Sequence, residues 1–153
     1  MTGSLKFDVG ALKEKGRAQV REDVPAADYQ EAVSGHAALR GPVSVALDLE
    51  VRGGQVLLRG RLSGRWELEC CRCLARHDFP YTALVEASAL STQPTVDAAD
   101  EVRQALVLAL PMLAYCRPDC KGLCVQCGAN KNLKECSCAP PRFELRKTGE
   151  SDA

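Results

Sequence analysis

The chain contains nine cysteines, and six of them follow Tyr115 within a short segment. In this segment Cys124 and Cys127 form a C-x-x-C turn followed by Gly128, and a glycine at that place supplies the backbone angles of a zinc knuckle. The other candidate ligands there are Cys116, Cys120, Cys136 and Cys138. Six thiols compete for the four positions of one tetrahedral site. The spacing therefore supports one zinc ion, with Cys124 and Cys127 as the best-placed pair.

A second pair, Cys70 and Cys73, has Cys71 between its members and Leu74 where a knuckle would carry glycine. This pair could complete a split site with Cys124 and Cys127, as in a zinc ribbon, or share in a second metal site. It could equally be a tight hairpin with two packed thiols. Cys71 is interpreted as an incidental free cysteine.

Catalytic interpretations of the cysteines have little support. A thioredoxin-like C-x-x-C opens a helix, whereas Cys70 and Cys73 lie between two expected strands. The histidine-glutamate signature of a zinc deaminase is missing from the sequence. An iron–sulfur cluster would also accept these thiolates, and the colour of the protein would distinguish it from zinc. All-thiolate zinc sites are usually closed and structural, so we expect no enzymatic activity and no small-molecule substrate.

Composition is typical of a globular domain. The 153 residues include 20 basic and 20 acidic side chains, which argues against a tail that binds nucleic acid by bulk charge. The longest apolar stretch, residues 105–116, is interrupted by Pro111 and is too short to cross a bilayer. Residues 1–10 have no apolar run of signal-peptide type. We therefore expect a cytoplasmic protein without a membrane partner, in which closely spaced cysteines bind metal rather than form disulfides.

The elements that must position the cysteines begin with a β-hairpin. Apolar residues alternate with polar ones on both sides of Gly53 and Gly54, a pair that suits a two-residue turn. With that turn, the residue numbers of two facing residues always add up to 107. This register predicts the apolar pairs Val51 with Val56, Leu49 with Leu58 and Val45 with Leu62, and the charged pair Asp48 with Arg59.

Further elements extend this hairpin. The second strand runs on to Cys70, with bends or bulges expected at Gly60 and Gly64, and alternation over residues 79–87 predicts a third strand. A helix near 97–110 is capped by Asp97 and ended by Pro111. We expect an α+β fold, a curled antiparallel sheet or a small β-barrel with one main helix and a carboxy-terminal zinc-binding segment. The expected parts are a β-rich core domain over 1–115, the cysteine-rich segment over 116–140 and a tail over 141–153.

Arginines concentrate around the second strand of the hairpin. Arg59, Arg61 and Arg65 share one parity, opposite to the apolar residues, and so project from the solvent side of the sheet. Arg72 and Arg76 extend this group at the turn. Because the guanidinium group grips two phosphate oxygens at once, the five arginines are candidate RNA-binding residues. The alternative is a solvated sheet face on which Arg59 pairs with Asp48.

Two motifs resemble the bacterial YceD family of large ribosomal RNA subunit accumulation proteins. The first runs from Trp66 to Leu74 and contains the Cys-x-Arg-Cys turn. The second combines residues 108–111 (Leu-Ala-Leu-Pro), residues 119–132 with their C-x-x-C-G-x-N-x-N pattern, and Cys136-x-Cys138, and it resembles the cysteine-rich branch of the family.

The resemblance implies a bacterial or organelle-derived, non-enzymatic factor that supports 23S rRNA accumulation and assembly of the large ribosomal subunit. The implied partners are rRNA or a pre-50S particle, or a ribosomal protein. Because some members of the family lack the carboxy-terminal cysteines, the Cys-x-Arg-Cys hairpin is the better candidate for the shared function. The alternative is a zinc-ribbon-like adaptor that binds another protein outside ribosome assembly.

Overall fold

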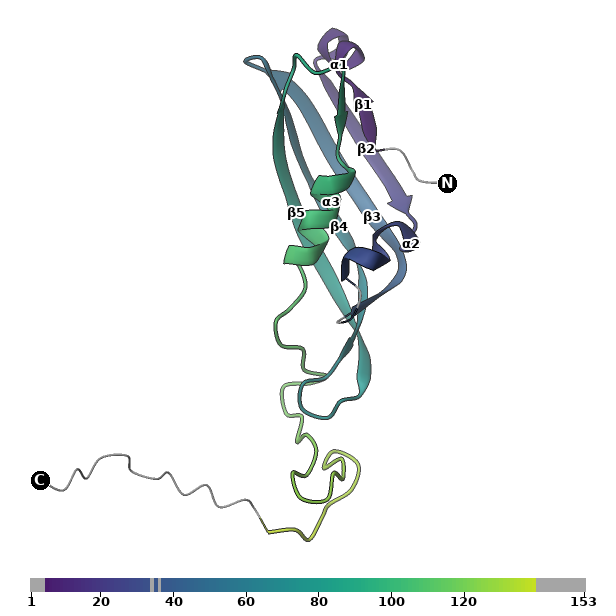
Figure 1. Cartoon of the computed structure of the whole chain (residues 1–153), viewed down its shortest axis with the longest axis vertical. Helices are drawn as coiled ribbons and strands as arrows, with labels where there is room; N and C mark the ends of the chain where they lie inside the picture. Colours follow the sequence, from purple (N-terminus) through teal and green to yellow (C-terminus); the bar gives the residue numbers. More distant parts are fainter. Residues whose placement is uncertain (1–4, 34, 36, 140–153) are drawn as a thin grey trace, which may run out of the picture.

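A computed structural model of the chain describes residues 5–33, 35 and 37–139 (Figure 1). The expected tail, 141–153, lies outside the described residues. The elements in chain order are β1 (Lys6–Asp8), α1 (Val9–Lys15), β2 (Arg17–Val24), α2 (Ala27–Gln30), the 3-10 helix η1 (Glu31–Val33), β3 (Ala37–Arg52), β4 (Gln55–Glu69), β5 (Arg76–Leu90), β6 (Thr95–Asp97) and α3 (Ala99–Leu108). Within this part of the chain no helix is long and apolar enough to cross a membrane.

Strands β3 and β4 form the predicted hairpin. The turn residues Gly53 and Gly54 have φ of 57° and 79°, the left-handed backbone that a two-residue hairpin turn requires. The three apolar pairs derived from the sequence all occur in the register. The third strand is β5, which pairs with β4 from the Gln55–Leu90 pair to the Glu69–Arg76 pair. The hairpin and the strand that follows it are therefore confirmed.

The sheet is open, with the antiparallel order β2-β3-β4-β5 and a separate two-stranded sheet of β1 and β6. Neither β2 nor β5 pairs with a further strand among the described residues. Helices α2 and α3 lie on one face of the sheet, which Figure 1 turns towards the viewer. These helices supply the apolar cover that the opposite wall of a barrel would give. The antiparallel sheet and the main helix are confirmed, whereas the barrel alternative is not supported.

The core lies between the sheet and the helices. Trp66 and Leu62 on β4 and Val102 and Leu106 on α3 are all fully buried. At the start of α3 the N-cap residue is Ala98 and not the predicted Asp97, although an oxygen of Asp97 accepts a hydrogen bond of 2.9 Å from the backbone N–H of Ala99, the first residue of the helix. Strand β4 thus turns its even-numbered residues inwards and its odd-numbered residues to the outer face, as the alternation predicted.

Gly60 does not mark a bulge, which corrects that expectation, whereas Gly64 lies opposite one, between Ser63 and Arg65, which pair with Ser44 and Arg40. Pairing with β5 continues through both Gly60 and Gly64, and the irregularity of the sheet lies on β3, between Arg40 and Ser44. A Cβ atom on Gly60 would lie 2.3 Å from the carbonyl oxygen of Ala46. A Cβ atom on Gly64 would lie 2.6 Å from the hydroxyl of Tyr81. Both glycines are needed because neighbouring atoms approach them closely.

The predicted charge pair between Asp48 and Arg59 is wrong, although the two residues do face each other. Asp48 instead accepts a hydrogen bond of 2.6 Å from the side-chain amide of Gln19 on β2. Arg59 lies 3.9 Å from Glu86 on β5. The prediction considered only the two strands of the hairpin. The flanking strands β2 and β5 each supply another partner, Gln19 for Asp48 and Glu86 for Arg59.

We expect Gly60→Ala to lower the free energy of unfolding by about 1–3 kcal/mol, because the new methyl group must displace a backbone carbonyl within a paired strand. Ser63→Ala, on the same strand, is the matched control, since that position already carries a Cβ atom. Urea denaturation followed by tryptophan fluorescence measures both variants. Equal unfolding midpoints for the two variants would contradict the close approach.

Candidate metal centres

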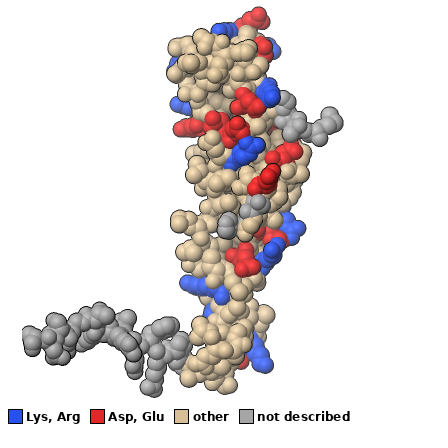
Figure 2. All heavy atoms as spheres, viewed as in Figure 1, with Lys and Arg blue, Asp and Glu red and all other residues tan. Residues whose placement is uncertain are grey.

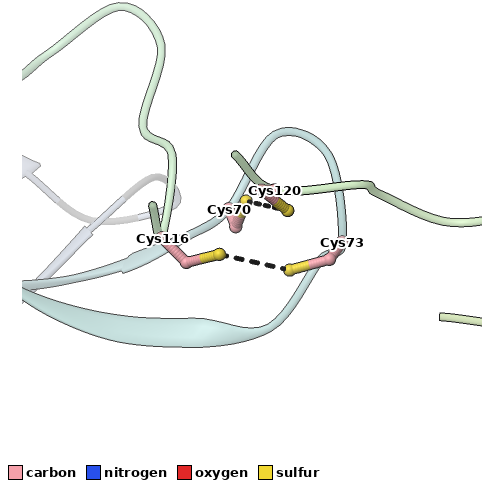
Figure 3. A group of neighbouring side chains, drawn as sticks. All are labelled: Cys70, Cys73, Cys116 and Cys120. Carbon is pink, nitrogen blue, oxygen red and sulfur yellow. Dashed lines mark hydrogen bonds between the residues drawn. The ribbon is translucent and has the colours of Figure 1, made fainter. Parts of the chain in front are cut away.

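The first candidate centre joins two distant parts of the chain. Cys70 and Cys73 belong to the turn between β4 and β5, and Cys116 and Cys120 belong to the segment after α3 (Figure 3). The Cys70 and Cys120 sulfurs lie 3.9 Å apart, and those of Cys73 and Cys116 lie 3.8 Å apart. All four sulfurs lie within 4.8 Å of one another. We name these four residues the first centre.

The second centre consists of Cys124, Cys127, Cys136 and Cys138, whose sulfurs also lie within 4.8 Å of one another. The two centres use all eight cysteines that the sequence singled out as candidate ligands. The grouping differs from the split-site alternative, because Cys70 and Cys73 meet Cys116 and Cys120 instead of Cys124 and Cys127. Spacing supported one site and left a second open, whereas the folded chain assembles two groups of four thiols.

Both centres contain the same backbone turn. The N–H of Leu74 donates to the carbonyl of Cys70 at 2.9 Å, and the N–H of Gly128 donates to that of Cys124 at 2.8 Å. Leu74 and Gly128 have φ of 59° and 71°. Leu74 therefore adopts the left-handed conformation for which a knuckle normally uses glycine. The turn tolerates the strain of this backbone conformation, and it directs the sulfurs of Cys70 and Cys73 towards the same point.

The environment of the leading thiol in each turn favours the thiolate. Burial raises the pKa of Cys70, but backbone N–H groups, including that of Cys116, outweigh burial and lower this pKa to about 6. The backbone N–H of Cys127 is the largest influence on Cys124 and helps to lower its pKa to about 6 as well. Thiolates are the form in which cysteine binds a metal ion, so each centre offers an anionic ligand near neutral pH.

The dimensions of the first centre suit a tetrahedral metal ion. Four sulfurs at about 2.3 Å from a zinc ion would be about 3.8 Å from one another, and the two sulfur–sulfur distances given above match this edge. A donor set of four thiolates suits zinc or iron and leaves no open coordination position. Either centre could therefore hold a metal ion, in a site that is closed to a substrate.

Arg72 fastens the cysteine-rich segment to the hairpin. Its guanidinium group donates to the carbonyls of Pro118 and Cys120 at 3.3 and 3.1 Å and lies 4.6 Å from the centre of the Tyr115 ring. The adjacent Cys71 lies outside both centres, and its backbone N–H donates to the carbonyl of Ala114 at 2.8 Å. The side chain of Arg72 is thus engaged with the chain itself.

The other candidate arginines fall into two groups. Arg59, Arg61 and Arg65 lie exposed on the outer face of β4, as their parity predicted. Arg61 and Arg65 form no ion pair with any described residue. Arg76 pairs with Glu67 at 2.8 Å.

Sequence reasoning missed further basic residues on this face, because it did not include β2. Strand pairing aligns Arg21 of β2 with Ala46, and Ala46 with Arg61. A hollow of about 490 Å³ lies here, lined by both of these arginines, by the acidic residues Glu22 and Asp23, and by Ser44 and Ser63. The mixture of charged and apolar residues in Arg17–Val24 gives only a weak strand signal.

We expect the chain to bind two metal ions, one in each centre. Cys70→Ser should lose the first and Cys124→Ser the second, so that each variant retains one ion, because a tetrahedral thiolate site needs all four ligands. Cys71→Ser is the control and should retain both. Native mass spectrometry counts the ions. Retention of two ions by either ligand variant would contradict the assignment.

We expect Arg72→Ala to loosen the segment that carries Cys116 and Cys120. Loss of two hydrogen bonds to carbonyls and of the contact with Tyr115 should lower its local stability by about 1–2 kcal/mol. Hydrogen exchange of residues 114–123 measures this change. Arg52→Ala is the matched control, since Arg52 lies far from this segment on the hairpin turn, pairs with Glu50 and is 74% exposed. Exchange as slow as in the wild type would show that Arg72 does not hold the segment.

Comparison with known proteins gives one family model and several relatives that match part of the chain. The family model described as large ribosomal RNA subunit accumulation protein YceD matches residues 84–146. An uncharacterized protein of Mycobacterium leprae is 30% identical over 106 residues, which cover 58% of this chain and 49% of that protein. No solved structure matches the chain.

Two plant proteins match shorter segments. Both are named large ribosomal RNA subunit accumulation protein YCED homolog 1, chloroplastic. The Zea mays protein is 41% identical over 46 residues, covering 29% of this chain and 16% of its own length. The Arabidopsis thaliana protein is 37% identical over 43 residues, covering 28% of this chain and 13% of its own length. The chain thus matches half or less of each relative. The predicted resemblance is confirmed: residues 84–146 match the YceD family model, and they include Cys116 and Cys120 of the first centre and all four cysteines of the second.

Proposed function

We propose that this protein is a non-enzymatic factor that supports 23S rRNA accumulation and assembly of the large ribosomal subunit. The observation that carries this proposal is the YceD match over residues 84–146, because the family is named for accumulation of the large ribosomal RNA. The family description names no reaction. The proposed partners are rRNA within a pre-50S particle or a ribosomal protein, and the proposed location is the cytoplasm of a bacterium.

The proposed ion in both centres is zinc, with a structural role, as expected for the cysteine-rich branch of the family. Zinc prefers four ligands in a tetrahedron and undergoes no redox change, which suits two closed thiolate sites. At the first centre zinc would tie the turn after β4 to the segment after α3. We propose the division into a core domain over 1–115 and a metal-binding segment over 116–140 on this basis, with Cys70 and Cys73 contributed by the core.

The proposed RNA-binding surface is the outer face of the sheet. The helix-covered side in Figure 2 carries acidic and basic side chains interspersed, so no single charge dominates that side. The outer face also carries both charges, including Asp23 and Asp48, but Arg61 and Arg65 are exposed there and form no ion pair with a described residue. Arg59 and Arg76 already pair with Glu86 and Glu67, and would bind phosphate by exchanging these partners. Arg72 would contribute mainly by positioning the segment.

A protein-binding adaptor is the second candidate, and exposed apolar residues favour it. At the end of α3 and in the segment that follows it, Leu108, Met112 and Leu113 are 84%, 98% and 62% exposed. Exposed apolar side chains grouped in this way often mark a protein interface. Sedimentation of the tagged protein through a sucrose gradient separates the two candidates. Migration with pre-50S particles supports the assembly factor, whereas a peak of free protein bound to a defined protein partner supports the adaptor.

We expect the double variant Arg61→Glu and Arg65→Glu to weaken binding to rRNA and to reduce migration with pre-50S particles. Each lost phosphate contact should also reduce the salt slope of binding by roughly 0.7–0.9. Filter binding at several salt concentrations measures the slope. Arg103→Glu is the control, since this residue lies on α3, where it pairs with Asp100. Unchanged binding with intact zinc content and thermal stability would exclude the outer face as the RNA surface.

A further inference from the structure

The side chain of Asn132 links the two centres. By sequence Asn132 belongs to the loop between Cys127 and Cys136 of the second centre. In the folded chain, however, its side-chain N–H donates to the sulfur of Cys120 in the first centre, at 3.3 Å. A residue held by one centre thus provides an outer hydrogen bond to a ligand of the other.

The orientation of the Asn132 amide is fixed by its other hydrogen bonds. Its oxygen accepts from the backbone N–H of Lys121 and from the guanidinium group of Arg117, both at 2.8 Å. Asn130 in turn accepts from the backbone N–H and the side-chain N–H of Asn132, at 3.0 and 2.9 Å. Two donors on the oxygen side and two acceptors on the nitrogen side leave one orientation that satisfies every group. The amide must therefore present N–H to Cys120.

The backbone between the centres is held on both sides. The N–H of Leu123 donates to the carbonyl of Arg72 in the turn after β4, at 2.9 Å. On the other side the N–H of Lys131, in the loop of the second centre, donates to the carbonyl of Gly122, also at 2.9 Å. A Cβ atom on Gly122 would lie 2.9 Å from the backbone oxygen of Arg72, so the close approach of the two backbone segments leaves room only for glycine at this position. The loop, the connecting segment and the hairpin turn therefore lie next to one another.

We propose that Asn132 is a positioning residue that couples the two metal centres, so that metal in one centre raises the affinity of the other. This proposal rests on the proposed metal sites. Four thiolates around a divalent ion carry a net charge of −2, and an N–H group directed at a sulfur stabilises that charge. Metal in the second centre orders the loop between Cys127 and Cys136 and thereby holds the Asn132 amide against Cys120. Because the coupling is a free energy between two binding events, it acts equally in both directions.

The test is a metal titration of the full chain with zinc ions against a chromophoric chelator, repeated with cobalt ions to observe tetrahedral thiolate coordination. Cys124→Ser with Cys127→Ser removes the second centre, and we expect the first centre to bind about tenfold more weakly than in the wild type. Asn132→Asp, which keeps the oxygen and removes the donor, should weaken the first centre by a similar factor. Adding Asn132→Asp to the double serine variant should then cause little further loss.

Gln126→Glu is the matched control, because it makes the same amide-to-carboxylate change in the second centre. Its side-chain N–H donates to the carbonyl of Ala139 at 3.0 Å and not to a sulfur. Fluorescence of Trp66, the single tryptophan, reports whether the sheet remains folded in each variant. We expect Gln126→Glu to bind zinc at the first centre as the wild type does.

The outcomes separate the coupling from the metal sites themselves. Two ions that bind independently, with the first centre unchanged by loss of the second or by Asn132→Asp, would overturn the coupling and leave both sites in place. A wild-type chain that takes up no zinc and no cobalt would overturn the sites and the coupling together. A loss in Gln126→Glu equal to that in Asn132→Asp would also overturn the role of Asn132, since it would trace the effect to charge alone.

Discussion

Strand β4 is paired with β3 along one edge and, without interruption from Gln55 to Glu69, with β5 along the other. This double pairing fixes which side chains face the core and which face outwards. It also determines where the strand ends, and Cys70 follows directly after its last residue. The turn that presents Cys70 and Cys73 is therefore held by fifteen residues of paired strand on each side, β4 before it and β5 after it. The first centre is formed where the segment after α3 reaches this fixed turn.

The parts of the fold that the sequence predicted well are those with local causes. The two-glycine turn and the alternation around it determine the register of the hairpin, and the Asp97 carboxylate meets the first backbone N–H of α3 because the two groups are near neighbours in the chain. Strand β2 was missed because its charged residues hide the alternation that identifies a strand. Its presence also changed the partners of Asp48 and Arg59, since long-range pairing decides which charges meet.

The candidate centres show a similar division. All eight cysteines could be predicted as metal ligands from their residue type and close spacing, because closely spaced thiols that do not form disulfides usually bind a metal ion. Spacing could not group them, since Cys73 and Cys116 are 43 residues apart and meet only through the path of β5 and α3. The absence of glycine after Cys73 made the first turn look weaker than it is. Leu74 adopts the left-handed conformation all the same, held by its hydrogen bond to Cys70.

The two centres differ in how much of the chain each one closes into a loop. A metal ion that joins Cys73 to Cys116 closes a loop of 43 residues, which contains β5, β6 and α3. In the second centre the gap between Cys127 and Cys136 is only nine residues. Because closure entropy grows with the logarithm of loop length, cross-linking the longer loop restricts the unfolded chain by about 1.4 kcal/mol more. An ion in the first centre therefore ties together the ends of a loop that contains an edge strand of the sheet and its covering helix, whereas an ion in the second closes a much shorter loop.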